Sequence, residues 1–556
     1  MKAYTNWLAL GEKEPWVEKA LDSLTETEKQ DAFYKSLEFG TAGMRGLLGV
    51  GPNRMNIYTI AKANLGYGKY LKETFSGPLK VAIAYDNRHM SKEFADISGR
   101  ILSTFGIDSY IFECPRPTPE LSYAVRKLNC VGGIVITASH NPKEYNGYKV
   151  YDETGCQLVD DKIAKVIEYV SEVGDETNID VHVGEKSMIR YLDEDFDQNY
   201  INKLKTIVLR EDLEKNIKIV FSSQHGTSYP LVPNILEDLG YDVIVVDEQK
   251  AYDPDFSNTK SPNPEDKKSF ELALKYAEEH DADLMLVADP DADRMGIAIK
   301  HEGEFVYLTG NEGGAILQEY LYSTKIELED MPENPVMFNT VVTSDLGEKI
   351  ARKYDVDVEK TLTGFKYIGE KIENHNRNNT KNFVFGYEES YGYLIKDFVR
   401  DKDALQACIA VSEATAYYKN KGKTLVDVLN DLTKEHGAYY DTLESLTLEK
   451  EAGLARIQRI LDNFRNEDYE DFAGIKVSKK EDYLTQKDSH GNTLDFPKSN
   501  VLKYFLEDGS WVAIRPSGTE PKCKFYYCVK DENMDASESK YKALSKAIND
   551  IIDTIQ

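Results

Sequence analysis

The sequence predicts an α/β protein of four domains: three topologically similar domains with mixed or parallel sheets and a C-terminal α+β domain, arranged around a central cleft. Three observations lead to this fold class. Strand-sized apolar runs alternate with helical stretches, one order of strands and polar turns occurs three times, and this pattern changes after about residue 440. Alternating strands and helices build mostly parallel sheets with right-handed crossovers. A chain of 556 residues is long enough for several such domains.

The threefold pattern is a weak internal repeat. In each copy a strand leads into a polar turn and a helix, and a second and a third strand follow. The first strands lie at 81–85, 217–221 and 335–339, and the third strands at 133–136, 284–288 and 382–385. The loops after the third strands read TASHNP, DPDADR and GYEES. Ligands gather at the carboxyl ends of such strands, so three chemically rich loops in equivalent places predict one shared cleft.

The last quarter of the chain follows a different pattern. Two charged helical stretches, 447–464 and 535–555, flank short strands such as 504–507, 511–514 and 524–529. This order is typical of a separate α+β domain. The predicted domains are 1–207, 208–323, 324–440 and 441–556.

Composition narrows the class of protein and of partner. The chain is 41% hydrophobic and its apolar runs are only strand-sized; with a mean hydropathy of -0.51, this predicts a soluble protein without a membrane span. The N-terminus has no apolar core of signal-peptide length. Six scattered cysteines without a CxxC pair indicate a reducing, cytoplasmic location. The net charge of -28 disfavours nucleic acids and anionic membranes as partners, and the oligomeric state stays open.

The loop TASHNP follows the apolar run Gly133–Ile136. A buried strand that ends in an exposed turn is where α/β proteins place reactive groups, and a serine held there, Ser139, is able to carry a phosphoryl group. The alternative is that Ser139 only caps the following helix, as small polar residues after strands often do.

The loop DPDADR places Asp289, Asp291 and Asp293 at alternate positions. In a short extended segment their oxygens converge on one hard cation and leave positions for water or phosphate, as Mg²⁺ prefers. Without a cation the loop is unfavourable, because two like charges 4 Å apart repel by about 4 kcal/mol at an effective dielectric constant of 20. An EF-hand is excluded, since it needs Gly and Glu where Arg294 and Lys300 stand. A solvated acidic turn is the other interpretation.

Three further loops carry weaker signals. GYEES offers Glu388 and Ser390 to sugar hydroxyls, although a plain polar turn has the same composition. RPSGTEPK at 515–522 combines an arginine fork with hydroxyl and backbone donors, which favours an anion site over an ordinary Pro/Gly turn. GTAGMRG at 40–46 is Gly-rich with one arginine, Arg45.

The motifs GTAGMRG, TASHNP, DPDADR, GYEES and RPSGTEPK, in this order and spacing, resemble those of the α-D-phosphohexomutase superfamily, which includes phosphoglucomutases and phosphomannomutases. The resemblance covers nearly the whole chain. It implies four domains around a deep cleft, the first three of one topology. The segments FGTAGMRG and ASHNPKEYNGYKVY are most similar to the phosphoglucomutase subgroup that also contains phosphopentomutases.

The resemblance also implies roles for individual residues. Ser139 resembles the phosphoserine that donates and recovers the phosphoryl group, with His140 supporting its loop. Asp289, Asp291 and Asp293 resemble Mg²⁺ ligands, with an oxygen on Ser139 as a further ligand. The basic residues that match those beside the transferring phosphoryl group are Arg45, Lys149 and Arg294. Lys366 matches a third-domain specificity loop, and Glu388 and Ser390 match sugar-hydroxyl readers. The clamp on the other phosphate is matched by Arg515, Ser517, Gly518, Thr519 and Lys522.

The activity that this implies is a Mg²⁺-dependent interconversion of α-glucose 1-phosphate and glucose 6-phosphate through a phosphoserine and glucose 1,6-bisphosphate, which would also serve as activator. Lys149 would be a candidate proton carrier. Glu-Glu-Ser at 388–390 is similar to glucose-type mutases, but Tyr387 is inserted after Gly386. Phosphopentomutase and phosphomannomutase activities therefore stay open, and a phosphohydrolase or a non-catalytic sugar-phosphate binder are more remote alternatives.

Overall fold

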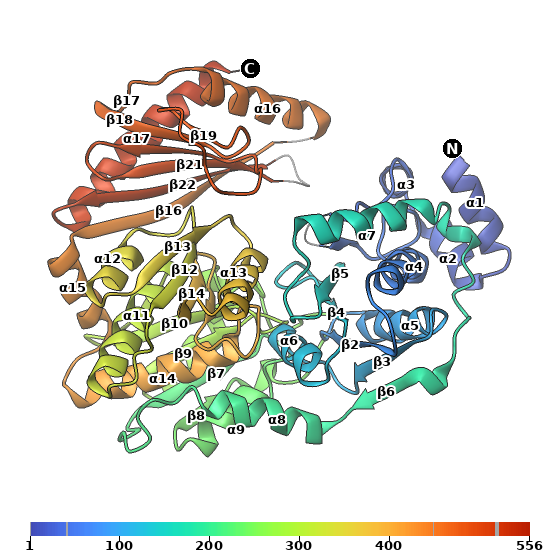
Figure 1. The fold of residues 1–556 in the computed structure, drawn as a ribbon, viewed down its shortest axis with the longest axis horizontal. Coiled ribbons are helices and arrows are strands. Elements are labelled where there is room, and N and C mark those ends of the chain that lie inside the picture. The colour runs from blue at the N-terminus through green and yellow to red at the C-terminus, as the bar shows by residue number, and fades with distance from the viewer. Residues whose placement is uncertain (1, 41–42, 449, 518–521, 556) are drawn as a thin grey trace. The chain divides into compact units, whose positions relative to one another are not determined.

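A computed structural model of the chain describes residues 2–40, 43–448, 450–517 and 522–555. The chain divides into two compact units. Unit 1 consists of Met1–Gly310, Pro332–Pro335 and Phe365–Thr424, and unit 2 of Asn311–Met331, Val336–Gly364 and Leu425–Gln556. Both units mix helices with sheets (Figure 1), as the sequence predicts. The predicted domain boundaries at 207, 323 and 440 stay a prediction.

Three N-terminal helices precede the first sheet of unit 1. They are α1 (Lys2–Gly11), α2 (Pro15–Ser23) and α3 (Glu26–Phe33). Trp7 of α1 is fully buried, and its indole N–H donates to Glu176 over 3.1 Å. Helix α3 begins with a capping box, in which Thr25 and Glu28 each accept from the backbone N–H of the other. Sequence reasoning did not single out these helices, because no motif lies in them.

The first sheet of unit 1 has the strand order β1-β5-β4-β2-β3-β6. Strands β4, β2, β3 and β6 run parallel, whereas β5 and β1 are antiparallel additions. The strands are β1 (Met44–Leu47), β2 (Leu79–Tyr85), β3 (Ile107–Phe112), β4 (Gly132–Ile136), β5 (Tyr145–Asp152) and β6 (Ile189–Leu192). The helices around it are α4 (Ile57–Thr74), α5 (Ser91–Ser103), α6 (Thr118–Lys127) and α7 (Asp160–Glu172). Every residue of β4 is buried, so its apolar run is explained by core packing.

The second sheet of unit 1 repeats this topology, with the order β11-β10-β9-β7-β8. The first strand of the repeat, β7 here and β2 in the first sheet, lies between the second and third strands of the repeat and runs parallel to both. An antiparallel strand lies beside the third strand. The strands are β7 (Lys218–Ser222), β8 (Asp242–Val245), β9 (Leu284–Ala288), β10 (Met295–His301) and β11 (Glu304–Leu308). The helices are α8 (Glu194–Lys205), α9 (Leu231–Asp238) and α10 (Glu271–Glu279), and four 3-10 helices cover 176–178, 186–188, 247–249 and 267–270.

The third copy of the repeat shows the same two kinds of pairing. Strand β12 (Pro335–Thr340) runs parallel to β13 (Asp357–Thr361), and β14 (Asn382–Glu388) runs antiparallel to β15 (Gly392–Leu394). Its helices are α11 (Gly310–Glu327), α12 (Leu346–Lys353), α13 (Phe365–Asn378), α14 (Ala404–Asn420) and α15 (Leu425–His436). Helix α14 is buried all round over 404–417, which explains why its sequence shows almost no amphipathic pattern.

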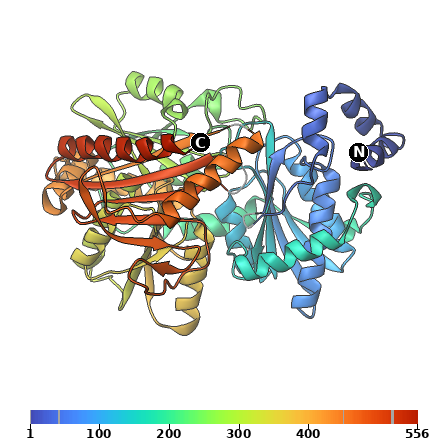
Figure 2. The same cartoon turned by 90° about the horizontal axis from the view of Figure 1, so that it is seen from above.

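The C-terminal part of unit 2 is an antiparallel sheet in the order β16-β22-β21-β20-β18-β17, with β19 beside β18. The strands are β16 (Ala438–Thr447), β17 (Asp471–Phe472), β18 (Ile475–Asp482), β19 (Lys487–Asp488), β20 (Leu502–Leu506), β21 (Trp511–Pro516) and β22 (Lys522–Asp531). Helices α16 (Lys450–Asn466) and α17 (Met534–Thr554) cover one face of it, as Figure 2 shows, and Phe464 and Ile548 belong to the shared core. This is the α+β architecture that the sequence predicts.

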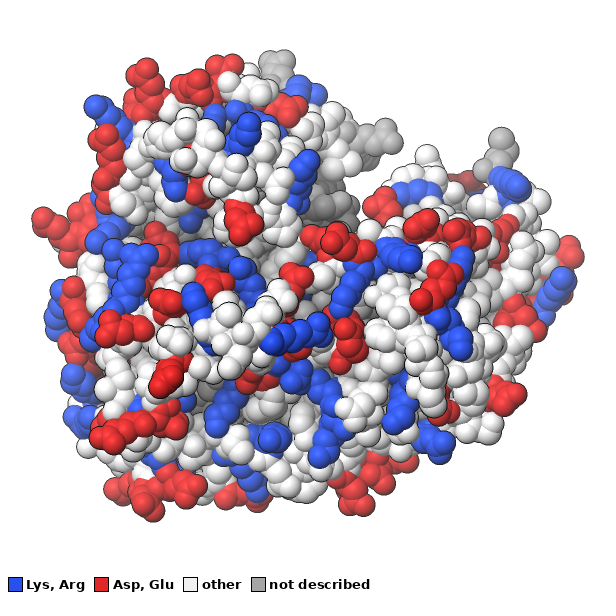
Figure 3. Space-filling model, in the orientation of Figure 1, with Lys and Arg blue, Asp and Glu red and all other residues white. Residues whose placement is uncertain are grey.

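Charges are dispersed over the surface. Figure 3 shows Asp and Glu side chains interspersed with Lys and Arg on the face drawn, in keeping with the net charge of -28. Among the described residues, no helix combines the length and apolarity that crossing a membrane requires.

Asp441 on β16 gives unit 2 a testable pH dependence. Its carboxyl is buried opposite Cys528, one of its oxygens has no hydrogen-bond partner among the described residues, and burial raises its pKa to about 7. Because the folded pKa lies above the unfolded value, the folded state binds the extra proton, so stability falls as the pH rises towards 7 and stays low above it. At 1.36 kcal/mol per pKa unit, the loss over the whole titration is on the order of 4 kcal/mol.

We therefore expect Asp441→Asn, which cannot titrate, to remove this part of the pH dependence. Urea unfolding at pH 5.5 and at pH 8.5 should show a smaller difference in free energy for the variant than for the wild type. An equal difference in both proteins would show that Asp441 is ionised throughout.

Candidate active site

The loop after β4, residues 137–142, is held in a tight turn that we call the serine loop. The Ser139 backbone N–H donates to Thr137 Oγ1 over 2.8 Å, and that of Asn141 donates to the Ala138 carbonyl over 3.1 Å. Ser139 itself has φ +51°, in the left-handed region that residues other than glycine seldom adopt. The turn brings Ser139, which is only 5% exposed, to the carboxyl edge of the first sheet.

The loop after β9, residues 289–294, folds around one of its own carboxylates, and we call it the acidic loop. Asp289 Oδ1 accepts from the backbone N–H groups of Asp293 and Arg294 over 3.1 and 3.0 Å. A tight fit holds the loop from behind, because a Cβ on Gly226 would lie 2.4 Å from Pro290 Cα. As a result Asp289, Asp291 and Asp293 are all buried and their oxygens lie within 4.8 Å of one another.

The serine loop and the acidic loop meet directly. Ser139 Oγ donates to Asp289 Oδ2 over 2.9 Å, across 150 residues of sequence, and His140 Nδ1 lies 3.2 Å from the same hydroxyl. Burial, with Arg294 and Arg45 nearby, lowers the pKa of His140 well below its usual value. A neutral imidazole therefore lies next to the hydroxyl of Ser139. The Asp289 carboxyl group accepts the hydrogen bond that this hydroxyl donates.

Two lysines face the carboxylates. Lys149 Nζ, on β5, lies 3.2 Å from Asp291 Oδ2 and 3.8 Å from Asp293 Oδ2. Lys402 Nζ, just before α14, lies 2.7 Å from Asp293 Oδ2. Thr118, at the start of α6, donates its hydroxyl to Asp291 Oδ2 over 3.1 Å. Three segments far apart in the sequence thus converge on the acidic loop.

The carboxylates share their charge unevenly. Burial, together with Asp291 and Asp293, raises the pKa of Asp289 well above its usual value. Burial acts in the same direction on Asp291, but Lys149 and the hydrogen bond to Asp289 outweigh it and lower that pKa. The cluster therefore holds less negative charge than three free carboxylates, which is the expected response of like charges crowded in a buried place.

The acidic loop fits a metal ion. Asp291 Oδ1 and Asp293 Oδ1 are buried and have no hydrogen-bond partner among the described residues. Buried carboxylate oxygens are normally paired, and both aspartates belong to the same cluster as Asp289. Three carboxylates that converge in this way provide the hard oxygen ligands that divalent cations take.

Other predicted residues lie around this cluster. The Arg294 guanidinium donates to Glu265 over 2.6 Å, and Arg45 donates to Asn141 Oδ1 of the serine loop over 2.8 Å. Glu388 ends β14 in a buried position. Against burial, Glu265 and Asp293 raise the pKa of Arg294, and Asp293 and Asp401 raise that of Lys402, and the charge of Glu388 adds to both effects. Ser390 follows in the loop to β15. The structure therefore brings Ser139, the three aspartates, Lys149, Arg45, Arg294 and Glu388 into one neighbourhood.

Two further predicted groups have contacts within their own units. Lys366, at the start of α13, forms an ion pair with Asp160 of α7 over 2.8 Å, and Tyr367 donates to the same carboxylate. Arg515 is the penultimate residue of β21 in unit 2, and just beyond this strand the Ser517 N–H donates to the Lys522 carbonyl over 2.7 Å. Gly518 and Thr519 lie outside the described residues.

Lys402 and Thr118 are site residues that sequence reasoning missed. Lys402 belongs to the charged run Arg400-Asp401-Lys402-Asp403, directly before an almost wholly apolar helix. Asp403 caps that helix by accepting from the N–H groups of Leu405 and Gln406. A charged run next to a buried helix is a signal that could have indicated Lys402, whereas nothing in the sequence around Thr118 points to Asp291.

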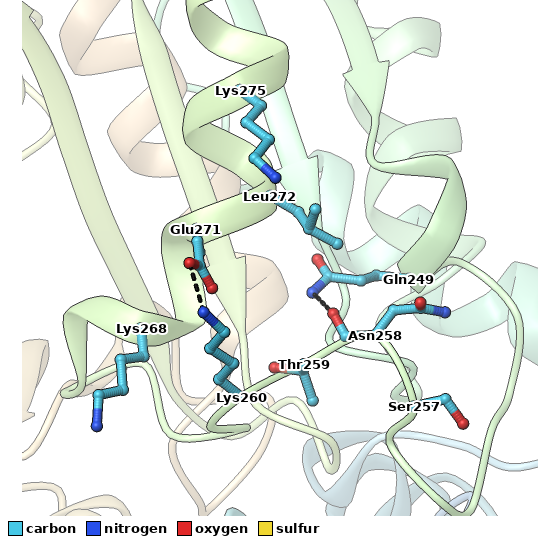
Figure 4. Close-up of a pocket in the computed structure, with 9 residues that line it drawn as sticks. All are labelled: Gln249, Ser257, Asn258, Thr259, Lys260, Lys268, Glu271, Leu272 and Lys275. Atoms are coloured by element: carbon cyan, nitrogen blue, oxygen red, sulfur yellow. Dashed lines mark hydrogen bonds and ion pairs between the residues drawn. The ribbon is translucent and has the colours of Figure 1, made fainter.

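A cavity of about 500 Å³ opens beside the serine loop. It is lined by residues 140–144 of that loop and its continuation and by the segment 255–263. A second cavity, of about 290 Å³, borders the same segment and is shown in Figure 4. There Lys260 is paired with Glu271 over 2.7 Å and Gln249 donates to the Asn258 carbonyl. None of the predicted site residues lines the second cavity, so only the first adjoins the site.

Comparison with known protein families shows to which family the chain belongs. Four models of the phosphoglucomutase/phosphomannomutase family match in succession: α/β/α domains I, II and III at 36–176, 198–303 and 309–436, and the C-terminal domain at 448–536. The chain belongs to this family, which is part of the α-D-phosphohexomutase superfamily. The predicted fold class of four α/β-type domains is thereby confirmed.

Two curated relatives identify the activity more specifically than the family does. The chain is 39% identical to the phosphoglucomutase of Staphylococcus haemolyticus over 541 residues, which cover 95% of this chain and 97% of that protein. It is 39% identical to that of Staphylococcus epidermidis over 98% and 99% of the two chains. It is accordingly an enzyme of the phosphoglucomutase type.

Solved structures share the fold at lower identity. Parafusin, a phosphoglucomutase from Paramecium, has a TM-score of 0.68 at 20% identity, with 94% and 95% of the two chains covered. A phosphoglucomutase/phosphomannomutase family protein from Burkholderia thailandensis has a TM-score of 0.68 at 18% identity, with 92% and 96% covered.

Proposed function

We propose that the enzyme interconverts α-glucose 1-phosphate and glucose 6-phosphate, and that Ser139 carries the phosphoryl group between the two positions of the sugar. The observation that supports this most directly is the contact of Ser139 Oγ with Asp289, at 2.9 Å, in a buried cluster of three carboxylates flanked by two lysines. A capping serine would not need a cluster of this kind.

The central physical problem is charge. A phosphoserine carries about -1.5 to -2 charge at neutral pH, so its reaction with a sugar phosphate brings two dianions together. Lys149, Lys402, Arg45 and Arg294 form a local basic group in an otherwise acidic protein, and such groups stabilise charge on a transferring phosphoryl group. Mg²⁺ bound by Asp289, Asp291 and Asp293 would add positive charge next to the same group.

A proton must also move, since the attacking sugar hydroxyl loses one as it accepts the phosphoryl group. Lys149 is our candidate carrier, because its ammonium lies at the edge of the carboxylate cluster and its side chain remains 13% exposed. Burial would lower the pKa of Lys402, but Asp293 and Asp401 outweigh burial and raise it, so Lys402 stays cationic.

The reaction needs a second phosphate site. Transfer from Ser139 yields glucose 1,6-bisphosphate, which must turn over and return its other phosphate to the serine. Arg515, Ser517, Gly518, Thr519 and Lys522 are the proposed clamp for the phosphate that does not react, and Glu388 and Ser390 the proposed readers of sugar hydroxyls. In this scheme added glucose 1,6-bisphosphate acts as activator, because it phosphorylates Ser139.

The choice of sugar rests on relatives and on one side chain. The aligned relatives are named phosphoglucomutase. The Tyr387 ring, whose insertion kept pentoses open, is fully buried and stacks on Phe385 with centroids 5.4 Å apart. It therefore belongs to the core rather than to a sugar-binding surface, so its insertion gives no reason to prefer a pentose.

The decisive experiment supplies Mg²⁺ and a trace of glucose 1,6-bisphosphate and compares glucose 1-phosphate, mannose 1-phosphate and ribose 1-phosphate. We expect turnover to be fastest on glucose 1-phosphate. Turnover on ribose 1-phosphate alone would keep the mechanism and replace the sugar. Release of inorganic phosphate without isomerised sugar phosphate would instead identify a hydrolase.

A further inference from the structure

The Arg88 guanidinium is bonded almost entirely to the backbone of the serine loop and its continuation. One terminal nitrogen donates to the Ser139 and Asn141 carbonyls over 2.6 and 2.5 Å. The other donates to the Pro142 and Tyr145 carbonyls over 2.7 and 3.1 Å. An arginine has five N–H donors, and four of them are thus used on one short stretch of chain.

The fifth donor fixes Arg88 to the first sheet. Its Nε–H donates to Asp86 Oδ2 over 3.1 Å, and the Asp86 backbone N–H donates to the Ile136 carbonyl at the end of β4. The side chains of Asp86 and Arg88 have no exposed surface. The guanidinium therefore stands on the rigid end of the strand pair from which the serine loop departs.

The segment after β8 covers this anchor. The Phe256 ring lies over the guanidinium, 5.1 Å from it, and Asn87 donates to the Asp253 carbonyl over 2.9 Å. Lys143, which follows the serine loop, pairs with Asp255 over 3.4 Å. Residues 253–256 thus pack over the anchor.

The serine loop needs such an anchor. Ser139 has an unfavourable left-handed backbone, and conformations of this kind persist only where the surroundings fix them. The four carbonyls belong to residues of the turn between β4 and the start of β5. Their common donor determines where the turn lies relative to the sheet.

We propose that Arg88 is the positioning residue of the serine loop, holding its backbone so that Ser139 Oγ stays in line with Asp289 and the transferring phosphoryl group. This inference rests on the proposed role of Ser139. Arg88 touches no reacting atom, and it acts through the carbonyls of the loop. A lysine cannot replace it, because a single ammonium with three donors cannot reach four carbonyls and a carboxylate in a planar arrangement.

The test compares Arg88→Ala and Arg88→Lys with Arg54→Ala as matched control. Arg54 is also buried in unit 1 and donates to a carbonyl and a carboxylate, those of Asn53 and Asp31, away from the serine loop. For each folded variant, kcat and KM are measured, together with the rate at which glucose 1,6-bisphosphate phosphorylates Ser139, followed by intact mass.

A small displacement of a reacting group costs about 10²-fold in rate. We therefore expect both Arg88 variants to lose about that factor in kcat and in the phosphorylation rate, with little change in KM. Added guanidinium should restore part of the rate of Arg88→Ala, because it fills the vacated site with the same donors. Arg54→Ala should keep the wild-type kcat and gain nothing from guanidinium, whatever its loss of stability.

The possible outcomes separate the inference from the proposed function. If the wild type is phosphorylated on Ser139 and a folded Arg88 variant is phosphorylated equally fast, the positioning role is wrong and the function stands. If Arg88→Ala does not fold, the rate of Arg88→Lys decides in the same way. A wild type that never acquires a phosphoryl group on Ser139 overturns both.

Discussion

Ser139→Ala should abolish turnover of glucose 1-phosphate, with a loss in kcat on the order of 10⁵-fold or more, as for other enzymes that lose their nucleophile. The variant lacks the atom that carries the phosphoryl group in the proposed mechanism. Stability should change little, because the substitution removes one hydrogen bond to Asp289, worth about 1 kcal/mol.

A coupled assay for glucose 6-phosphate measures the loss, and intact mass after incubation with glucose 1,6-bisphosphate shows whether a phosphoryl group is gained. Ser98→Ala is a suitable control, since Ser98 is a fully buried serine of the same sheet region that donates to Phe94. It should keep both activity and phosphorylation. A Ser139→Ala protein that still gained a phosphoryl group would place the acceptor elsewhere.

Much of the fold could be predicted because its signals are local. Each third strand of the repeat is a short apolar run, and in β4 and β9 every residue is buried, so the run and the core coincide. After β4 and β9 the polar motif begins where the strand ends, whereas β14 continues through Glu388 and so includes the first three residues of GYEES. Because each of the loops 137–142 and 289–294 follows the carboxyl end of the equivalent strand in its own sheet, the repeat predicts that the two loops share one cleft.

The contacts that complete the site could not be predicted in this way. Thr118 and Lys402 reach the acidic loop from the start of two different helices, and no periodicity links those helices to residues 289–294. Arg88 lies in a turn that the repeat marks only as polar. The ion pair of Lys366 with Asp160 joins two helices that no sequence pattern links, and the expected place of Lys366 in a specificity loop stays a prediction. Pairings over such separations depend on tertiary packing, which a local pattern does not encode.

The acidic loop allows a second prediction of large effect, because a bound cation reverses its energetics. Without a cation the three carboxylates repel one another at short range. Removing one charge should therefore leave the metal-free protein no less stable than the wild type. With a cation the same charge becomes a ligand, and its removal should cost both affinity and activity. Asp291→Asn is the variant of choice, because Asp291 Oδ1 has no hydrogen-bond partner among the described residues.

We expect Asp291→Asn to reduce kcat/KM by roughly 10³-fold, the scale seen when one strong electrostatic contact to a transition state is lost.

Thermal unfolding gives an independent measurement. A ligand at 100 times its Kd stabilises a protein by about 2.7 kcal/mol, so Mg²⁺ should raise the Tm of the wild type and barely change that of Asp291→Asn. In EDTA, which removes the cation, the Tm of the wild type should not exceed that of Asp291→Asn. Asp281→Asn, which removes an exposed carboxylate paired with Lys300, controls for the change in net charge and should respond to Mg²⁺ like the wild type. An equal Mg²⁺ response in Asp291→Asn would show that the acidic loop is not the metal site, and the interpretation of its unpaired oxygens would have to be abandoned.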